Sequence, residues 1–195
     1  MSAKRRVCLV GGSKGGVGKS LLAMTVLDYL KDKPADDGQT LFVETDNSNP
    51  DVWKAYRDSV PSTLLDLDTA DGWLELLNHC ADPAYTTIVI NTAARNNLAV
   101  TQFGERLALG LAELDVTLVT LWVINTQLDS LELLKQYRSA LPIGELHVVR
   151  NEFRGSNFRL YDESDLRRGI NAHGCLSLSM STLAERVTQE LYGRQ

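Results

Sequence analysis

A glycine-rich loop between an apolar run and a helical pattern is the feature that most constrains the fold of this chain. Residues 11–20 read GGSKGGVGKS. The loop glycines leave backbone N–H groups free to surround phosphate oxygens, because a Cβ at those positions would block their approach. The apolar residues 7–10 have strand character, and residues 21–27 continue as a helix whose N-terminus would face the phosphates. The sequence therefore predicts a nucleotide-binding loop at a strand–helix junction.

The end of the loop carries the side chains that nucleotide binding requires. Lys19 would supply positive charge to the β- and γ-phosphates, and the Ser20 hydroxyl would be a ligand for Mg²⁺. The residues expected to contact the nucleotide are those of the loop and the first helical turn: Ser13, Lys14, Gly15, Gly16, Val17, Gly18, Lys19, Ser20 and Leu21. The alternative is a glycine-rich turn that binds nothing, which the match from position 14 to position 20 disfavours.

The string KGGVGKS at residues 14–20 resembles the deviant Walker A motif of the ParA/MinD family of ATPases. The general phosphate-loop pattern has glycine at position 13 and does not require the lysine that follows it. In that family the first lysine reaches across a dimer interface to the nucleotide of the partner subunit. The resemblance implies ATP or ADP and Mg²⁺ as cofactors and a homodimer formed with ATP. Lys14 would then act in trans and Lys19 in cis.

Beyond the loop, apolar strands alternate with amphipathic helices. The predicted strands are 7–10, 40–44, 87–91, 116–124 and 147–151. The predicted helices are 20–31, 50–58, 72–80, 98–112, 130–140, 163–169 and 182–191. Continuous apolar strands indicate a parallel sheet covered on both faces. The expected fold class is α/β, a three-layer αβα P-loop NTPase fold with a mostly parallel sheet. With no linker of biased composition, residues 1–195 are expected to form a single ATPase domain.

Two carboxylates follow the second predicted strand, at the sheet edge where ligands of such folds bind. The ParA/MinD family has D-x-D-P-Q in this segment, and its second aspartate is linked to hydrolysis and to the nucleotide-sensing switch. Asp46 occupies that position and Glu44 the first, while Asn47 and Ser48 replace the Pro-Gln. The resemblance thus implies Lys14, Lys19 and Asp46 as catalytic residues. A polar turn that uses Asp and Asn for backbone hydrogen bonds is the alternative for Asp46, and for Glu44 the two interpretations are equally supported.

Asn91 ends the third predicted strand, where the family carries the Walker B aspartate that holds the Mg²⁺ shell through a water. An amide keeps the size and accepts a hydrogen bond, but it lacks the charge that balances Mg²⁺. The metal site implied by the resemblance is Ser20, Asp46 and Asn91. Two outcomes are open: slow hydrolysis with Asp46 and Ser20 carrying the metal, or ATP binding as a switch with little turnover.

Two later segments bear on the site. Asn151 ends a strand similar to the family strand whose asparagine lies near the adenine, although an asparagine that only terminates a strand is equally plausible. Residues 129–132, DSLE, have the pattern of a capping box that opens the following helix. The sequence of residues 122–130 is similar to that of short ParA-like proteins carried on plasmids, of the plasmid-stability and conjugation-associated (StbB/TraL-like) kind.

Composition limits the partners and the compartment. No apolar run is long enough to cross a membrane. The three cysteines are widely spaced, so we expect them to be buried thiols in the reducing cytoplasm. A net charge of −5 argues against a protein coated in nucleic acid. Arginines among aromatic residues in the C-terminal third could contact non-specific DNA, but the acidic residues between them favour a solvated face: Arg150, Arg154, Arg159, Arg167 and Arg168 with Phe153, Phe158 and Tyr161. The narrow apolar stripe of residues 182–191 favours packing against the core over membrane binding.

The resemblance therefore implies a Mg-ATP-dependent, dimerising ATPase switch in plasmid partition, stability or conjugative transfer. It would act through an unidentified partner protein and without a membrane. The alternative is a nucleotide-binding regulatory scaffold with little or no hydrolysis, motivated by Asn91. A small-molecule kinase or ligase would need an inserted lid or substrate pocket, and an iron–sulfur carrier would need a C-x-x-C pair; neither feature occurs in the sequence.

Overall fold

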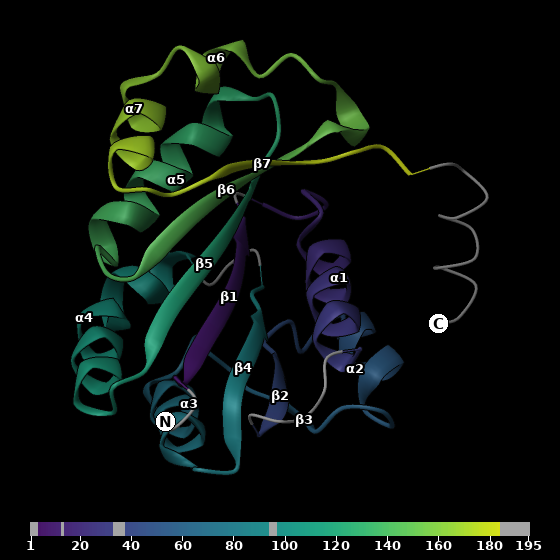
Figure 1. The fold of residues 1–195 in the computed structure, drawn as a ribbon, viewed down its shortest axis with the longest axis vertical. Coiled ribbons are helices and arrows are strands. Elements are labelled where there is room, and N and C mark those ends of the chain that lie inside the picture. Colours follow the sequence, from purple (N-terminus) through teal and green to yellow (C-terminus); the bar gives the residue numbers. More distant parts are fainter. Residues whose placement is uncertain (1–3, 13, 33–37, 94–96, 184–195) are drawn as a thin grey trace.

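A parallel β-sheet forms the centre of the molecule (Figure 1). The computed structural model describes residues 4–12, 14–32, 38–93 and 97–183, and within these seven strands form one sheet in the order β3-β2-β4-β1-β5-β6-β7. Every neighbouring pair in this order is parallel. The strands are β1 (Arg6–Gly12), β2 (Gln39–Glu44), β3 (Ser62–Leu64), β4 (Tyr85–Asn91), β5 (Thr117–Ile124), β6 (Glu145–Asn151) and β7 (Ser177–Met180).

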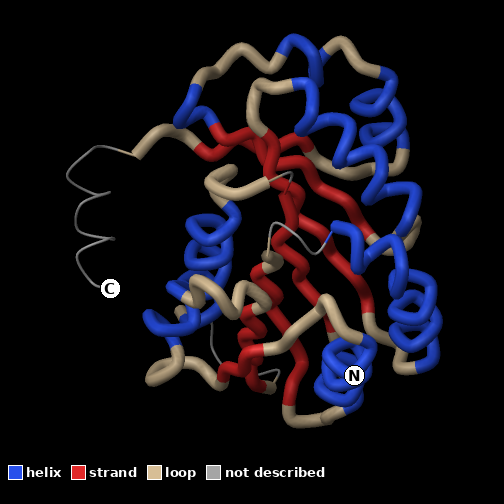
Figure 2. Tube along the Cα trace, turned by 180° about the vertical axis from the view of Figure 1, so that it is seen from behind, coloured by secondary structure: helices blue, strands red, loops and turns tan. Residues whose placement is uncertain are grey.

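Helices cover both faces of this sheet, as Figures 1 and 2 show from opposite sides. One face carries α1 (Lys19–Lys31) and α2 (Asp51–Tyr56). The other face carries α3 (Ala70–Ala81), α4 (Asn97–Glu113) and α5 (Leu128–Ala140), with the shorter α6 (Arg159–Asp162) and α7 (Asp165–Ala172) packed on the same core cluster. The predicted three-layer αβα arrangement is therefore confirmed, and the sheet is parallel throughout the described strands.

The core follows from the two periodicities of the sequence. Along β5, Leu118, Trp122 and Ile124 belong to the cluster beneath α3, α4 and α5, while Val123 belongs to a cluster on the α1 face. Helix α4 presents Phe103, Leu107 and Leu111 to the first cluster, a four-residue spacing that puts them on one helix face. Buried apolar side chains on both faces of the sheet explain why the central strands read as continuous hydrophobic runs.

The topology places the loop at residues 14–18 where ligands of such sheets bind. β1 lies between β4 and β5, and the chain leaves its carboxyl end toward β2 before it returns and crosses to β5. The loop therefore begins at a point where the strand order reverses, and parallel sheets of this type bind ligands in the crevice outside such a point. The carboxyl ends of β2, β4 and β6 bring Glu44, Asn91 and Asn151 to the same edge of the sheet.

The five predicted strands are present, but several element boundaries were wrong. β3 and β7 were not predicted, because they are edge strands of three and four residues with few buried side chains. The helix predicted at 163–169 is replaced by α6, a turn and α7, since Ser164 caps α7 by accepting a hydrogen bond from Arg167 N at 3.2 Å. Of the helix predicted at 182–191, residues 184–191 lie outside the described residues, and positions 182 and 183 are not helical.

The capping box predicted at the start of α5 is also wrong. The helix begins at Leu128, and its N-cap residue, Gln127, makes no side-chain capping hydrogen bond. The Asp129 carboxylate instead accepts a hydrogen bond from Lys14, and the Ser130 hydroxyl accepts one from Asn125 N at 3.2 Å. Both side chains are therefore engaged elsewhere.

The described residues include the three cysteines and the helices to be considered as membrane spans. Cys8 and Cys80 are buried and Cys175 is partly exposed, and all three are free thiols. Within the described part of the chain, no helix combines the length and the apolar character that a membrane span needs.

Candidate functional site

The loop between β1 and α1 has the backbone conformation that its glycines make possible. Gly16 and Gly18 have φ values of 71° and 108°, in the region that favours glycine. A Cβ at Gly18 would lie 2.6 Å from Asn151 Nδ2, whereas a Cβ at Gly15 would have no heavy atom within 4 Å. Ser13 lies outside the described residues. The loop is thus closely packed at Gly18 and open at Gly15, where a phosphate group would have room.

Lys19 is the first residue of α1 and is only 8% exposed. Its Nζ donates a hydrogen bond to the carbonyl oxygen of Lys14 at 3.1 Å, so the ammonium lies within the loop. Burial lowers the pKa of Lys19, and the carboxylates of Asp46 and Glu44 act in the opposite direction. Positive charge is therefore concentrated beside the open loop, next to a helix N-terminus without acidic residues in its first turn.

Glu44 and Asn91 form a hydrogen-bonded pair across β2 and β4, where they are register partners. Asn91 Nδ2 donates to Glu44 Oε1 at 3.1 Å and to Oε2 at 3.0 Å. Both side chains are buried, with exposures of 3% for Asn91 and 0% for Glu44. Burial raises the pKa of Glu44 to about 7, although hydrogen bonds from Asp46 N, Asn91 and Thr45 N act against this rise. Asn91 Oδ1 is buried and has no hydrogen-bond partner among the residues that the structure describes.

Asp46 takes part in a local turn as well as in the charge distribution of the site. Its Oδ1 accepts hydrogen bonds from Ser48 Oγ at 2.5 Å and from Asn49 N at 3.3 Å. These contacts are those of the polar turn that the sequence left open as an alternative. The Asp46 carboxylate also acts to raise the pKa of Lys19, against the effect of burial, and the turn contacts leave the functional interpretation of Asp46 open.

The Lys14 side chain contacts the start of α5. Its Nζ donates hydrogen bonds to Gln127 Oε1 and, at 2.8 Å, to Asp129 Oδ2. The hydrogen bond from Lys14 lowers the pKa of Asp129. The two loop lysines therefore have separate environments: Lys19 is buried in the loop, and Lys14 is partly exposed and bound to a later segment of the same chain.

Asn151 contacts the loop directly. Its Nδ2 donates to the carbonyl oxygen of Val17 at 2.8 Å, and its Oδ1 accepts from Phe153 N at 3.0 Å. The second bond caps the 3-10 turn η2 (Glu152–Arg154). Asn151 thus holds the loop through its hydrogen bond to Val17. The sequence did not predict this contact, because the two residues are 134 positions apart.

The structure therefore brings most of the predicted site residues to one end of the sheet. Ser20 and Leu21 lie in the first turn of α1, Ser20 exposed and Leu21 partly exposed. Sequence reasoning missed Gln127 and Asp129 as partners of Lys14, and it did not pair Glu44 with Asn91. The strand register would have been needed to find that pair, because the two residues are 47 positions apart.

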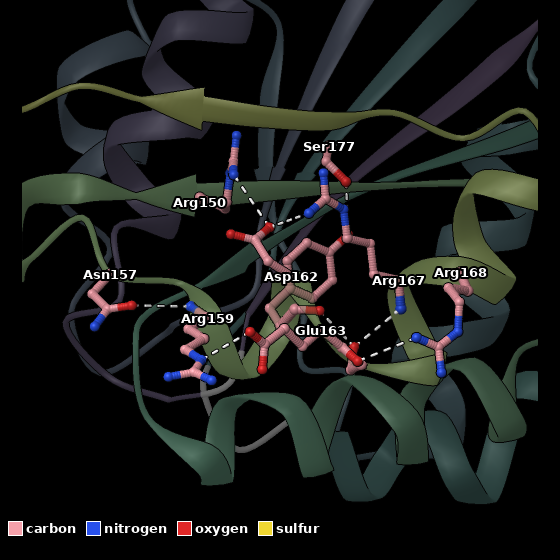
Figure 3. Close-up of polar contacts among 10 residues, drawn as sticks. Arg150, Asn157, Arg159, Asp162, Glu163, Arg167, Arg168 and Ser177 are labelled. Carbon is pink, nitrogen blue, oxygen red and sulfur yellow. Dashed lines mark hydrogen bonds and ion pairs between the residues drawn. The ribbon is translucent and has the colours of Figure 1, made fainter.

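The C-terminal arginines form ion pairs within their own segment (Figure 3). Asp162 accepts from both Arg150, at 3.4 Å, and Arg167, at 2.5 Å. Two further pairs join Arg159 to Glu163 and Arg168 to Asp165. Phe158 and Tyr161 are buried, so two of the three aromatic side chains considered for DNA contact belong to the core. This arrangement favours the solvated, ion-paired face; the side chain of Arg154 lies outside what the structure describes.

Comparison with known proteins gives one relative in sequence and several solved structures with a similar fold. No protein-family model matches the chain. Protein MobD of Acidithiobacillus ferrooxidans is 48% identical over 193 residues, which cover 98% of this chain and 84% of that protein. A ParA family ATPase from Chlorobium tepidum TLS is 19% identical, with a TM-score of 0.56 over 100% of this chain and 90% of that chain.

A second solved structure is a protein of Borrelia burgdorferi B31, proposed to act in plasmid partition and bound to AMPPNP. It is 14% identical, with a TM-score of 0.59 over 97% of this chain and 89% of that chain. At these identities the likeness establishes the fold. The expected resemblance to ParA-type P-loop NTPases is thereby confirmed at the level of the fold.

Proposed function

The chain belongs to the same family as Protein MobD of Acidithiobacillus ferrooxidans, and from this premise we propose that it is a Mg-ATP-dependent, dimerising ATPase switch in plasmid partition, stability or conjugative transfer. The ATPase domain would comprise residues 1–195 and would act in the cytoplasm. The fold shared with ParA-type ATPases supports the ATPase part of this proposal, and the AMPPNP bound to the Borrelia protein supports a nucleotide as ligand.

The observation that carries the proposal is the environment of Lys19. A buried ammonium at the first position of a helix, 3.1 Å from a carbonyl oxygen of an open glycine loop, is an arrangement suited to binding polyphosphate. Phosphate oxygens between the β1–α1 loop and Lys19 would receive backbone N–H groups, the helix dipole and the ammonium together. Gly15, with free space beside its Cα, would allow close approach of the phosphates.

The residues present also fit a magnesium ion. Ser20 is the hydroxyl ligand expected of a phosphate loop, and Asp46 offers a carboxylate nearby. Asn91 Oδ1 is a buried acceptor without a partner among the described residues, which suits a hydrogen bond from a water of the ion's shell. When bound, Mg²⁺ would neutralise charge on the β- and γ-phosphates.

The roles of the chain's own residues follow from their positions. Lys19 would bind the terminal phosphates in cis, and Asp46 would orient the attacking water. Lys14 would leave Gln127 and Asp129 and contact the nucleotide of a second subunit, so that two subunits close face to face around two ATP molecules. Hydrolysis would reopen the dimer, and a partner protein would sense the ATP-bound form. Non-specific DNA is a candidate second partner.

Steady-state ATP hydrolysis tests the proposal most directly. Turnover is measured with Mg²⁺, with and without double-stranded DNA, and the Lys19→Ala protein serves as the blank. Turnover above the blank, raised further by DNA, is the expected result for a partition-type ATPase. Nucleotide binding equal to that of Lys19→Ala, together with turnover equal to the blank, would exclude the proposed function.

A second candidate function is a nucleotide-binding regulatory scaffold with little or no hydrolysis. Asn91 favours it, since a neutral amide stands where an anionic side chain would balance the metal. The two candidates differ in one measurable property: a scaffold binds ATP as tightly as an ATPase does, and Lys19→Ala abolishes that binding, yet turnover with and without DNA stays at the level of the blank.

A further inference from the structure

The Glu44–Asn91 pair distributes charge in a way that neither residue indicates alone. Among the buried side chains that the structure describes, Glu44 is the one carboxylate and Lys19 the one ammonium. Glu44 lies on β2, yet its carboxylate reaches Asn91 on β4, with both oxygens within 3.1 Å of the amide nitrogen. A carboxyl group is thus present at the end of β4, although the side chain that the sequence places there is a neutral amide.

The carboxylate also fixes which way the Asn91 amide faces. Nδ2 donates to both Glu44 oxygens, and the opposite orientation would place Oδ1 against a carboxylate that can only accept. The Glu44 carboxyl oxygens therefore hold Nδ2 toward themselves and leave Oδ1 on the other side. That is the buried oxygen without a partner among the described residues.

The Glu44 side chain is itself held by its own strand end. Its Oε1 accepts hydrogen bonds from Thr45 N and Asp46 N, each at 3.0 Å. The side chain is fully buried, so rotation away from Asn91 would break these bonds and require a new cavity. The backbone after β2, the carboxylate and the amide thus form one connected hydrogen-bond network.

We propose that Glu44 is a positioning residue for the magnesium site: it orients Asn91 so that Oδ1 is available to a water of the metal shell, and it places a carboxyl group beside the amide that ends β4. This inference rests on the proposed nucleotide function. Glu44 on β2 then provides the carboxyl group that position 91 on β4 lacks, and Glu44 and Asn91 act as a pair.

A charge-swap experiment tests this assignment. Binding of a fluorescent ATP analogue is titrated with Mg²⁺ for the parent, Glu44→Gln, and the double variant Glu44→Gln/Asn91→Asp. Glu163→Gln is the matched control, since it removes an exposed carboxylate that is paired only with Arg159 among the contacts described. We expect Glu44→Gln to bind the analogue in EDTA like the parent, but to need at least tenfold more Mg²⁺ for half-maximal enhancement of binding.

The double variant separates a positioning role from a structural one. It restores one carboxylate and one amide with their places exchanged, so we expect its Mg²⁺ requirement to return to within threefold of the parent. A folded Glu44→Gln protein with the parent's Mg²⁺ requirement would overturn the inference, as would a folded double variant that stays at least tenfold weaker. Thermal unfolding without nucleotide shows which variants fold, and the double variant alone decides the matter if Glu44→Gln does not.

The same titration keeps this inference apart from the proposed function. If the parent binds the analogue no better than Lys19→Ala, with or without Mg²⁺, the proposed function fails before Glu44 is considered. If the parent binds and Lys19→Ala does not, the proposed function survives, and the Mg²⁺ requirement of the Glu44 variants alone decides the inference.

Discussion

Lys14 donates a hydrogen bond to the carboxylate of Asp129, 2.8 Å away, so that the first loop lysine is bound to the first turn of α5 in its own chain. The two side chains are 41% and 50% exposed, and an exposed ion pair of this kind contributes little to stability. The contact holds Lys14 in a defined place, but little free energy is needed to break it. In the proposed dimer, a nucleotide on the second subunit would therefore compete with Asp129 for the same ammonium.

Lys14→Ala should separate nucleotide binding from dimerisation. The substitution removes the charge proposed to act in trans but leaves Lys19 in place, so we expect ATP affinity within about threefold of the parent and loss of the ATP-dependent dimer. Size-exclusion chromatography with light scattering, in the presence of Mg-ATP, measures the dimer. Lys54→Ala, which removes an exposed lysine of α2, is the control; a Lys14→Ala protein that dimerises like the parent would show that the in-trans role is wrong.

Asp129→Ala should favour the dimer. Without its carboxylate, less free energy is needed to move Lys14 out of the monomer contact, so the protein concentration for half-maximal ATP-dependent dimerisation should fall by about two- to fivefold, the range of an exposed ion pair. Sedimentation at several protein concentrations measures this value. Asp165→Ala removes an exposed carboxylate paired with Arg168 and should leave it unchanged. An equal or higher concentration for Asp129→Ala would contradict the competition.

Gly18→Ala and Gly15→Ala should have opposite signatures. At Gly18 a Cβ meets Asn151 Nδ2 at 2.6 Å and the φ of 108° is strained for alanine, so we expect the free energy of unfolding to fall by about 2 kcal/mol. At Gly15 a Cβ meets nothing within 4 Å, so the free energy of unfolding should stay within about 0.5 kcal/mol while ATP affinity falls. Urea unfolding and calorimetric titration measure the two quantities. Equal losses of stability would contradict the packing described at Gly18.

The stability of the protein should depend on pH through Glu44. Burial raises the pKa of Glu44 from its ordinary value of 4.5 to about 7, so the folded state binds this proton more tightly than the unfolded state. Between these two pH values the unfolded state loses the proton first, and the free energy of unfolding falls as pH rises. This loss of stability amounts to about 3 kcal/mol. It is absent below pH 4.5 and complete above pH 7.

Glu44→Gln isolates this contribution, because glutamine does not titrate. The free energy of unfolding of the parent, relative to Glu44→Gln, should fall by about 3 kcal/mol between pH 4.5 and pH 7.5 in urea unfolding experiments. Glu163→Gln, which removes an exposed carboxylate and retains Glu44, is the control for the loss of a carboxyl group. Parallel pH profiles for the parent and Glu44→Gln would mean that Glu44 titrates alike in the folded and unfolded states.

The sequence predicted the central part of the fold because local pattern and tertiary environment agree there. Ile88, Val89 and Ile90 read as a buried strand, and all three are buried in β4. β7 differs, since Leu178 is 42% exposed and its strand pairs only with β6 in the sheet described. Short edge strands have little hydrophobic pattern, so their position in the sheet determines that they form, more than their local sequence does.

The candidate site was predicted in its residue types but not in its contacts. The loop at 13–20 was recognisable because its residues are consecutive, and Asn91 stood out because of its position at a strand end. The start of α5 was misplaced because the Asp129 carboxylate is engaged by Lys14, 115 positions earlier. Contacts between residues so far apart in the sequence depend on the register and order of the strands, and no short sequence pattern contains this information.

Asn151 has a mechanical consequence for the molecule. One amide bonds the phosphate loop at Val17 through its nitrogen and the η2 turn at Phe153 N through its oxygen. Any displacement of the loop peptide at Val17 must either stretch this link or carry the turn along with it. The ring of Phe153, 60% exposed, would move with the turn, so a displacement of the loop peptide would change the position of one aromatic side chain on the surface.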